Sequence, residues 1–256
     1  MLYFIVFIFG LSIGSFINCL IWRIHEKKTI LGRSFCPKCK HKLSWYDNIP
    51  LFSFFFLHGK CRYCGEKISW QYPIVELITA VLFVLAFFIH FSGSNFLLIV
   101  RDWFLISVMI VVFIYDLKYY LILDIISLPS ILIIFIFNFF LGFNLLNLLI
   151  SGIIGGSFFL FQFLISKGEW IGGGDIRLGI LMGVALAWPM SVIAILLAYI
   201  IGVIAVLPLL ISKKKKFKSE IPLGIFLSTA TIITLFWGEA ILNWYLNLPL
   251  YFLSFL

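Results

Sequence analysis

The chain has 256 residues, 63% of them apolar or aromatic, and its mean hydropathy is +1.14. Only 12% of the residues are charged, compared with about 25% in a typical soluble domain. A soluble fold of this length cannot bury so much apolar surface, so the composition excludes a soluble enzyme, a disordered chain and a secreted disulfide scaffold. The apolar runs are long and unbroken, which favours helices over the alternating strands of a membrane barrel. We therefore expect an all-α polytopic membrane protein.

Eight apolar segments approach the length of about 20 residues that a helix needs to cross a bilayer. In chain order they are Met1–Trp22, Ile74–Phe91, Phe96–Tyr115, Ile125–Phe143, Leu145–Ile165, Ile176–Trp188, Pro189–Ile211 and Leu223–Leu242. The first segment lacks a basic start and a small-residue cleavage site, which indicates a retained anchor and not a signal peptide. The sixth segment is short for a full crossing. The last residues of the chain are apolar but too few for another crossing, so we expect them to lie in the outer membrane interface.

The basic residues are distributed very unevenly between the two sides of this eight-span arrangement. The net charge is +8, and 18 of the 19 Lys and Arg residues fall on the side that contains the loop after the first segment. The positive-inside rule makes that side cytoplasmic and places both termini outside. The run Lys213–Lys216 is expected to be a topology anchor. The basic excess therefore indicates a bilayer as the partner, and no nucleic acid is expected to bind.

These observations divide the chain into four parts. Residues 1–22 form the first transmembrane helix, and residues 23–72 form the one loop that is long enough to be a domain. Residues 73–244 form the transmembrane core, and residues 245–256 form a C-terminal interfacial tail. The predicted location is a membrane, with the long loop on its cytoplasmic side.

The long loop contains two Cys-x-x-Cys pairs, formed by Cys36 with Cys39 and by Cys61 with Cys64. The two pairs are separated by 21 residues, close to the spacing of zinc ribbons. Because the loop is assigned to the reducing cytosol, a shared metal ion is favoured over disulfides. Four thiolates complete a tetrahedral zinc site, so we expect the ion to be structural, without an open position for a catalytic water.

Carboxyl groups inside a membrane are costly and usually functional. Asp116 ends the third apolar segment, and Asp175 follows three glycines at the start of the sixth. Both are expected near the cytoplasmic ends of their helices, at the same depth. Two close carboxyl groups share one proton, so one can accept a proton from water while the other donates to a peptide carbonyl. The alternative is a structural role, in which the two residues cap helices or pair with Lys118 or Arg177.

The order and spacing of several motifs resemble the type IV prepilin peptidases. The matching stretches are Gly14-Ser15-Phe16-Ile17-Asn18, Gly32-Arg33-Ser34, Asn48-Ile49-Pro50 with Ser53, Gly59-Lys60-Cys61, Tyr72-Pro73-Ile74-Val75-Glu76-Leu77, Tyr115-Asp116 with Asp124, Gly172-Gly173-Gly174-Asp175 and Pro222-Leu223-Gly224. The resemblance therefore covers most of the chain. Two positions depart from the family pattern, since Arg177 stands where Lys is usual and Leu123 stands where Pro usually precedes the acidic residue.

The resemblance implies that Asp116 and Asp175 are the catalytic aspartates and that Cys36, Cys39, Cys61 and Cys64 bind zinc. It implies cleavage of the basic leader of type IV prepilins and pseudopilins after a Gly, at the cytoplasmic membrane face. It also implies methylation of the new N-terminal amine with S-adenosylmethionine. The sequence contains no Gly-rich dinucleotide-type motif for that donor.

Two other interpretations use the same residues. A proton-coupled transporter would use buried carboxylates, but the acids gather at one face and the chain shows no inverted repeat. A structural assembly protein would use the cysteine loop for docking and would tolerate changes at Asp116. Two further acidic residues, Glu76 and Asp124, are expected to support the site without taking part in catalysis. Glu76 is expected to face the helix bundle and contact the loop, at Asn48 or Arg62, and Asp124 is expected to have a secondary positioning role.

Overall fold

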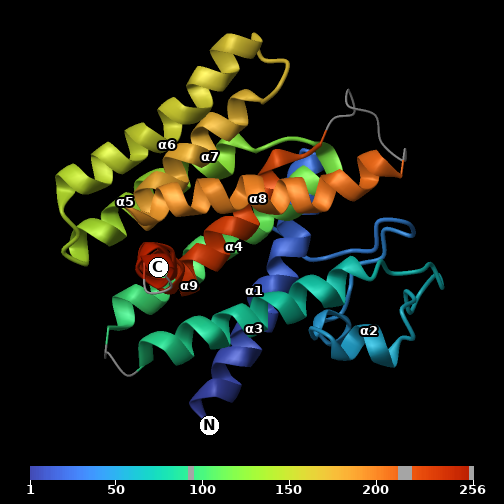
Figure 1. The fold of residues 1–256 in the computed structure, drawn as a ribbon. Helices are drawn as coiled ribbons and strands as arrows, with labels where there is room; N and C mark the ends of the chain where they lie inside the picture. Colours follow the sequence, from blue (N-terminus) through green and yellow to red (C-terminus); the bar gives the residue numbers. More distant parts are fainter. Residues whose placement is uncertain (92–94, 213–220, 254–256) are drawn as a thin grey trace. The chain divides into compact units, whose positions relative to one another are not determined.

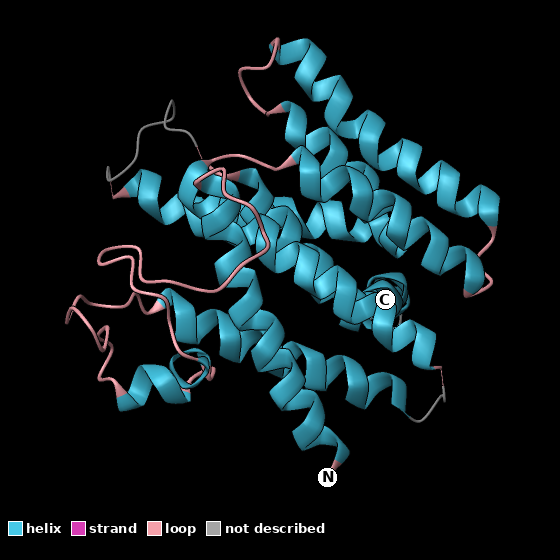
Figure 2. Cartoon of the chain, turned by 180° about the vertical axis from the view of Figure 1, so that it is seen from behind, coloured by secondary structure: helices cyan, strands magenta, loops and turns pink. Residues whose placement is uncertain are grey.

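The computed structural model describes residues 1–91, 95–212 and 221–253 (Figure 1). Figure 2 shows these residues as helices joined by loops. The run Lys213–Lys216 and the last three residues of the predicted tail lie outside the described ranges. The helices are α1 Leu2–His25, η1 Trp45–Asn48 (a 3₁₀ helix), α2 Phe52–Phe56, α3 Gln71–Phe91, α4 Phe96–Tyr119, α5 Asp124–Phe140, α6 Leu145–Ser166, α7 Gly173–Leu186, α8 Met190–Ile211 and α9 Leu223–Leu253.

Each of the eight predicted spans coincides with one of these helices, which confirms an all-α polytopic membrane protein. Among the described residues, six helices are long and apolar enough to cross a membrane, namely α1, α3, α4, α6, α8 and α9. Helix α5 has 17 residues and α7 has 14, fewer than the roughly 20 of a perpendicular crossing. Helix α9 continues past its predicted end at Leu242 as far as Leu253, so the start of the predicted tail is continuous with the last helix.

The chain forms two compact units, residues 1–111 and 112–256, and the division falls within α4. In the N-terminal unit α1 packs against α3. Gly10 and Gly14 make this approach close, because a Cβ on Gly10 would lie 2.5 Å from the Cα of Ala80 and one on Gly14 would lie 2.6 Å from the Cα of Glu76. Small residues four positions apart are a common way for membrane helices to pack at short distance.

A buried charge network joins α3 and the start of α4 in the N-terminal unit. Asp102 has no exposed surface, and its Oδ2 lies 2.8 Å from Nε2 of His90. The side chain of the adjacent Arg101 donates to the other carboxylate oxygen, Oδ1, with its Nε at 2.7 Å. The carboxylate is therefore not left alone in an apolar environment, where an unpaired charge is very costly.

Helix α7 lies at the centre of the C-terminal unit, since it contacts α5, α6, α8 and α9. Its close partner is α6. A Cβ on Gly155 of α6 would overlap the carbonyl of Gly179, and one on Gly183 of α7 would overlap the carbonyl of Ser151. The two helices thus meet backbone to backbone along two small-residue pairs.

The carboxyl end of α7 is held by two asparagines from neighbouring helices. Asn138 of α5, fully buried, donates its side-chain amide to the carbonyl of Val184 at 2.7 Å. Asn147 of α6 accepts from the backbone N–H of Trp188 at 2.9 Å. Because the last carbonyls of a helix have no partners within it, these contacts fix where α7 ends and hence where its amino end lies.

Candidate active site and metal centre

Asp116 lies one turn before the end of α4 and is 4% exposed. Its carboxyl group faces the amino end of α9, where the backbone N–H groups of Gly224 and Ile225 interact with it. Gly224 lies so close that a Cβ there would be 2.8 Å from Oδ2 of Asp116. Free N–H groups and the helix dipole make the amino end of a helix favourable for a negative charge, so α9 stabilises the carboxylate.

Asp175 lies in the first turn of α7 and is 6% exposed. Its Oδ2 accepts from the backbone N–H of Gly172 at 2.9 Å. Asp175 therefore does make the helix-capping contact that the sequence offered as an alternative to catalysis. This contact uses one carboxylate oxygen and orients the side chain, which leaves the second oxygen available for chemistry.

The two carboxyl groups come together within the C-terminal unit. The charge of Asp116 acts on Asp175, and Ile122, from the loop between α4 and α5, contacts the start of the helix beside each of them. A Cβ on Gly174 would lie 2.7 Å from Cβ of Ile122, and one on Gly224 would lie 3.3 Å from its Cδ1. Ile122 thus acts as the spacer between the amino ends of α7 and α9.

The predicted structural alternative of ion pairing is not what the described part of the chain shows. Arg177 pairs with Asp124, and within the described residues no Lys or Arg forms an ion pair with Asp116 or Asp175. The Asp124–Arg177 pair links the start of α5 to the first turn of α7. Asp124 is thereby placed close to the site without belonging to the carboxyl pair.

The four loop cysteines form one cluster. Their Sγ atoms all lie within 4.8 Å of one another, with Cys36 and Cys64 at 3.9 Å, and none is in a disulfide. A tetrahedral zinc ion with Zn–S bonds of about 2.3 Å separates its sulfurs by roughly 3.8 Å. The cluster therefore has the size and the donor set of a structural zinc site.

The two Cys-x-x-Cys segments form knuckles with the same hydrogen bonds. In the first, the Lys40 N–H donates to the Cys36 carbonyl at 2.9 Å, and in the second the Gly65 N–H donates to the Cys61 carbonyl at 2.9 Å. Each knuckle is closed by one isolated bridge, Phe35–Lys42 in the first and Lys60–Lys67 in the second. Each knuckle thus presents its two sulfurs in the same way, and facing each other they complete a four-sulfur shell.

The four thiols do not ionise independently. Burial raises the pKa of Cys36, but hydrogen bonds from the Cys39 and Lys38 backbone outweigh it and lower the pKa to about 7. For Cys64 a backbone hydrogen bond at Glu66 acts downward, yet burial and the three other cysteines raise its pKa to about 11. Without a cation the Cys36 thiol therefore ionises more readily than the Cys64 thiol, and a divalent metal ion would stabilise the thiolate of Cys64 as well.

A polar network connects the second knuckle to η1. The carboxylate of Asp47 accepts from Nε of Arg62 at 2.8 Å and from the hydroxyl of Tyr63 at 3.2 Å. Burial raises the pKa of Asp47, but these bonds and the Ser44 N–H outweigh it and lower the pKa below its usual range. This network could not be predicted from the sequence, because the partners are 15 and 16 positions apart in an irregular loop.

Glu76 lies in α3 and is 6% exposed. The predicted contact between Glu76 and the loop is confirmed, but its partner is the backbone N–H of Leu51, which donates to Oε2 at 2.8 Å. The suggested partner Arg62 pairs instead with Asp47. A backbone donor has no residue-type signature, so the sequence could not identify it.

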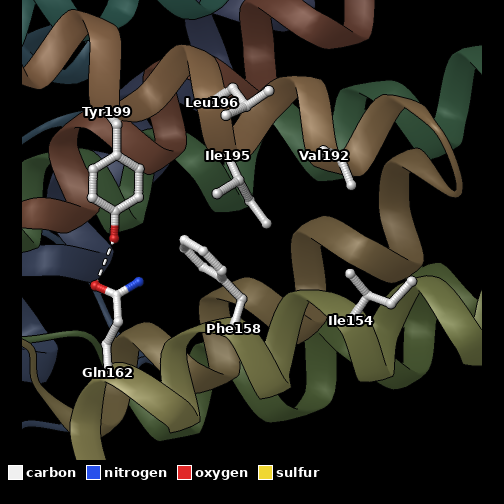
Figure 3. Close-up of a pocket in the computed structure, with 7 residues that line it drawn as sticks. All are labelled: Ile154, Phe158, Gln162, Val192, Ile195, Leu196 and Tyr199. Carbon is white, nitrogen blue, oxygen red and sulfur yellow. Dashed lines mark hydrogen bonds between the residues drawn. The ribbon is translucent and has the colours of Figure 1, made fainter. Parts of the chain in front are cut away.

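A groove of about 420 Å³ runs between α6 and α8 in the C-terminal unit (Figure 3). Its walls are apolar except at one end, where the hydroxyl of Tyr199 donates to Oε1 of Gln162 at 2.9 Å. The charge of Asp175 acts on Tyr199, so the polar end of the groove is the end nearer the carboxyl pair. This pair could not be predicted from the sequence, because one Gln and one Tyr in separate apolar helices form no motif.

Residues 8–91 match the family model described as Bacterial Peptidase A24 N-terminal domain, and residues 103–207 match the Type IV leader peptidase family. No solved structure matches the chain significantly.

Three curated relatives are each named prepilin leader peptidase/N-methyltransferase. The protein from Aeromonas salmonicida (strain A449) is 31% identical over 96% of this chain and 94% of its own length. The protein from Bacillus subtilis (strain 168) is 32% identical, covering 96% of this chain and 98% of its own length. The one from Vibrio cholerae is 34% identical over 77% of this chain and 85% of its own length. The likeness thus extends over both units.

Proposed function

The chain belongs to the type IV leader peptidase family, and we propose that it is a membrane aspartic endopeptidase that removes the leader peptide from type IV prepilins and pseudopilins. The observation that carries the proposal is the pair of buried carboxyl groups. Asp116 and Asp175 are 59 positions apart in the sequence, yet the charge of one acts on the other.

The chemistry follows from the surroundings of the two side chains. Each carboxyl group lies at the amino end of a helix, which favours its ionised form, whereas their mutual repulsion disfavours two charges. The pair therefore holds one proton between them. The ionised member takes a proton from a water molecule that attacks the peptide carbonyl carbon, and the protonated member donates to the carbonyl oxygen.

The groove between α6 and α8 supports a prepilin-like polypeptide as the substrate. A polypeptide cleaved at a membrane boundary has one polar side and one apolar side of the scissile bond. The apolar walls of the groove suit the apolar side of the substrate. The Tyr199–Gln162 pair offers hydrogen bonds to the substrate backbone where it unwinds near Asp175. The scissile bond then lies at the carboxyl pair, and the basic leader extends past the pair, away from the groove.

The proposed orientation rests on the distribution of basic residues. With 18 of the 19 Lys and Arg on one side of the predicted spans, the carboxyl pair and the cysteine loop lie on the cytoplasmic face and both termini lie outside. Together with the family membership, this orientation supports the bacterial inner membrane as the proposed location. No feature of the described residues favours the transporter alternative.

The loop cysteines Cys36, Cys39, Cys61 and Cys64 are proposed to hold one zinc ion. The four-sulfur shell leaves no position for water, so the ion supplies folding energy to the loop and takes no part in peptide hydrolysis. N-methylation of the new N-terminus with S-adenosylmethionine is proposed on the names of the relatives alone. It is a second step on the same product and requires that cleavage come first.

The test uses the purified protein in detergent with a leader-bearing prepilin, read by mass spectrometry with and without the methyl donor. Asp116→Asn and Asp175→Asn should each abolish cleavage, because neither amide can exchange the shared proton. Asp124→Asn is the matched control, since it removes a carboxylate close to the site that is not part of the pair, and it should be milder.

Each variant must remain monodisperse and keep its metal, so that loss of folding is not mistaken for loss of chemistry. Cleavage by either pair variant at near the unmodified rate would refute the proposal. An assembly protein would tolerate both changes, and a transporter would lose ion flux without any change in prepilin mass.

A further inference from the structure

The short helix α2 presents an unusual surface for a loop outside the membrane core. Phe52 and Phe55 are each 60% exposed, and Phe56 is 77% exposed. Their spacing of three and four residues places the three rings on one side of the helix. Phe54, between them, is buried in the loop. We name Phe52, Phe55 and Phe56 the α2 aromatic face.

A hydrogen bond fixes the level of α2 along α3. The backbone N–H of Leu51, at the start of α2, donates to Glu76 at 2.8 Å. Glu76 lies five positions after the first residue of α3, which corresponds to roughly 7 Å along a helix axis. Helix α3 has 21 residues, or about 31 Å, close to the thickness of the hydrocarbon core. The start of α2 is therefore held at the depth where α3 enters the membrane.

A ring contact places α2 at the same level independently. The buried ring of Phe54 lies edge-on against Trp70, with 4.9 Å between the ring centroids. Trp70 directly precedes α3 and is itself 64% exposed. Tryptophan just outside a membrane helix is characteristic of the headgroup region. Helix α2 is thus anchored to α3 at two points, both near the membrane boundary.

We propose that the α2 aromatic face inserts into the headgroup region of the bilayer on the side where α3 begins. Three exposed phenyl rings form an apolar surface that water solvates poorly, and the bilayer interface is the apolar partner nearest to them. The exposed Lys60, a few residues after α2, adds positive charge where anionic headgroups lie.

The inference is separate from catalysis, because it holds whether or not the carboxyl pair cleaves peptides. Its consequence is that the cysteine loop is docked on the membrane along one face, in addition to its covalent attachment to α1 and α3.

The test is a fluorine NMR measurement on the full-length, zinc-loaded protein in nanodiscs of phosphatidylethanolamine and phosphatidylglycerol. Phe55 and, separately, Phe56 are replaced by 4-trifluoromethyl-phenylalanine. Relaxation by dissolved oxygen, which concentrates in lipid, is compared with relaxation by a water-soluble nickel chelate. Lys38 at the tip of the first knuckle, whose side chain is 69% exposed, receives the same label as the control.

We expect oxygen to act more strongly than nickel at positions 55 and 56, and the reverse at position 38. Stronger relaxation by nickel at 55 and 56 would mean that the face is free in water and available to a soluble partner, which overturns the proposal. Protection from both reagents would mean that protein covers the face, from elsewhere in the chain or from a second copy, and that result also overturns it.

Discussion

Two equivalent positions in the cysteine knuckles differ in how well their residues suit the backbone. Gly65 has φ of 72° and Lys40 has φ of 57°, and both lie four positions after the first cysteine of their knuckle. Glycine adopts this left-handed region freely, whereas a residue with a Cβ is strained there. The second knuckle is thus relaxed at this position and the first is not.

The first prediction follows from this difference. A Cβ on Gly65 would meet no atom within 4 Å, so Gly65→Ala adds only backbone strain, about 1 kcal/mol. Because metal binding and loop folding are coupled, zinc affinity should fall by roughly fivefold in a chelator competition. Lys40→Gly should raise zinc affinity. Equal zinc affinities for the two variants would contradict the difference in backbone strain between the two knuckles.

At the carboxyl pair, Gly224 matters because it has no side chain. The second prediction is that Gly224→Ala displaces the carboxyl group of Asp116, which lies 2.8 Å from the added atom. Because misplacing a reacting group by about 1 Å can cost 10²-fold in rate, kcat should fall by about two orders of magnitude while the protein stays folded.

The control for this change is Gly202→Ala on α8. Its added Cβ would lie 3.4 Å from the ring of Phe226, also near the start of α9, which is an ordinary contact. This variant should keep near-normal kcat. If both substitutions reduce kcat equally, the effect reflects packing of α9 and not the position of Asp116.

Among helices, α7 connects the packing of the C-terminal unit to the site, because it is buried along most of its length and has Asp175 in its first turn. The third prediction concerns its contact with α6. Gly155→Ala would push against the backbone of Gly179 and should destabilise the protein by about 1–3 kcal/mol, the usual cost of overpacking.

The measurement is thermal unfolding in detergent together with cleavage rate. Ser157→Ala, two residues further along α6 and exposed, is the matched control and should leave both unchanged. We expect Gly155→Ala to lower both, because a shift of α7 moves Asp175. A lower unfolding temperature with full activity would show that α7 can move without disturbing the carboxyl pair.

The helices were predictable because a membrane helix appears in the sequence as a long apolar run. All eight expected segments coincide with a helix of the structure. The end of α9 was not predictable, because the residues after Leu242 are themselves apolar and mark no boundary, and the helix continues through them to Leu253. The candidate site could be predicted only at Asp116, Asp175 and the four cysteines, because charged and thiol side chains are rare in this sequence and stand out. Ile122 and Gly224 are two among many apolar residues and glycines, so their contacts could come only from the structure.

For the molecule as a whole, the fourth prediction is that one zinc ion is present per chain. Removing it with a strong chelator should expose the loop between α1 and α3 to protease, because a segment of this size has little core of its own. The helical content measured by circular dichroism should change little, since the long helices do not depend on the metal. Absence of metal with disulfide-linked cysteines would refute the zinc proposal.

The buried network of His90, Arg101 and Asp102 has a consequence for how the chain is made. During synthesis each hydrophobic segment passes from the ribosome into the membrane, and an acidic or basic residue raises the free energy of that step by up to about 3 kcal/mol at the centre of a helix. Helix α4 carries both Arg101 and Asp102, and the interhelical partner of Asp102 lies on α3. Partition into lipid is therefore most favourable when α3 and α4 enter together as a hairpin. The carboxylate of Asp102 can then contact His90 before it leaves water.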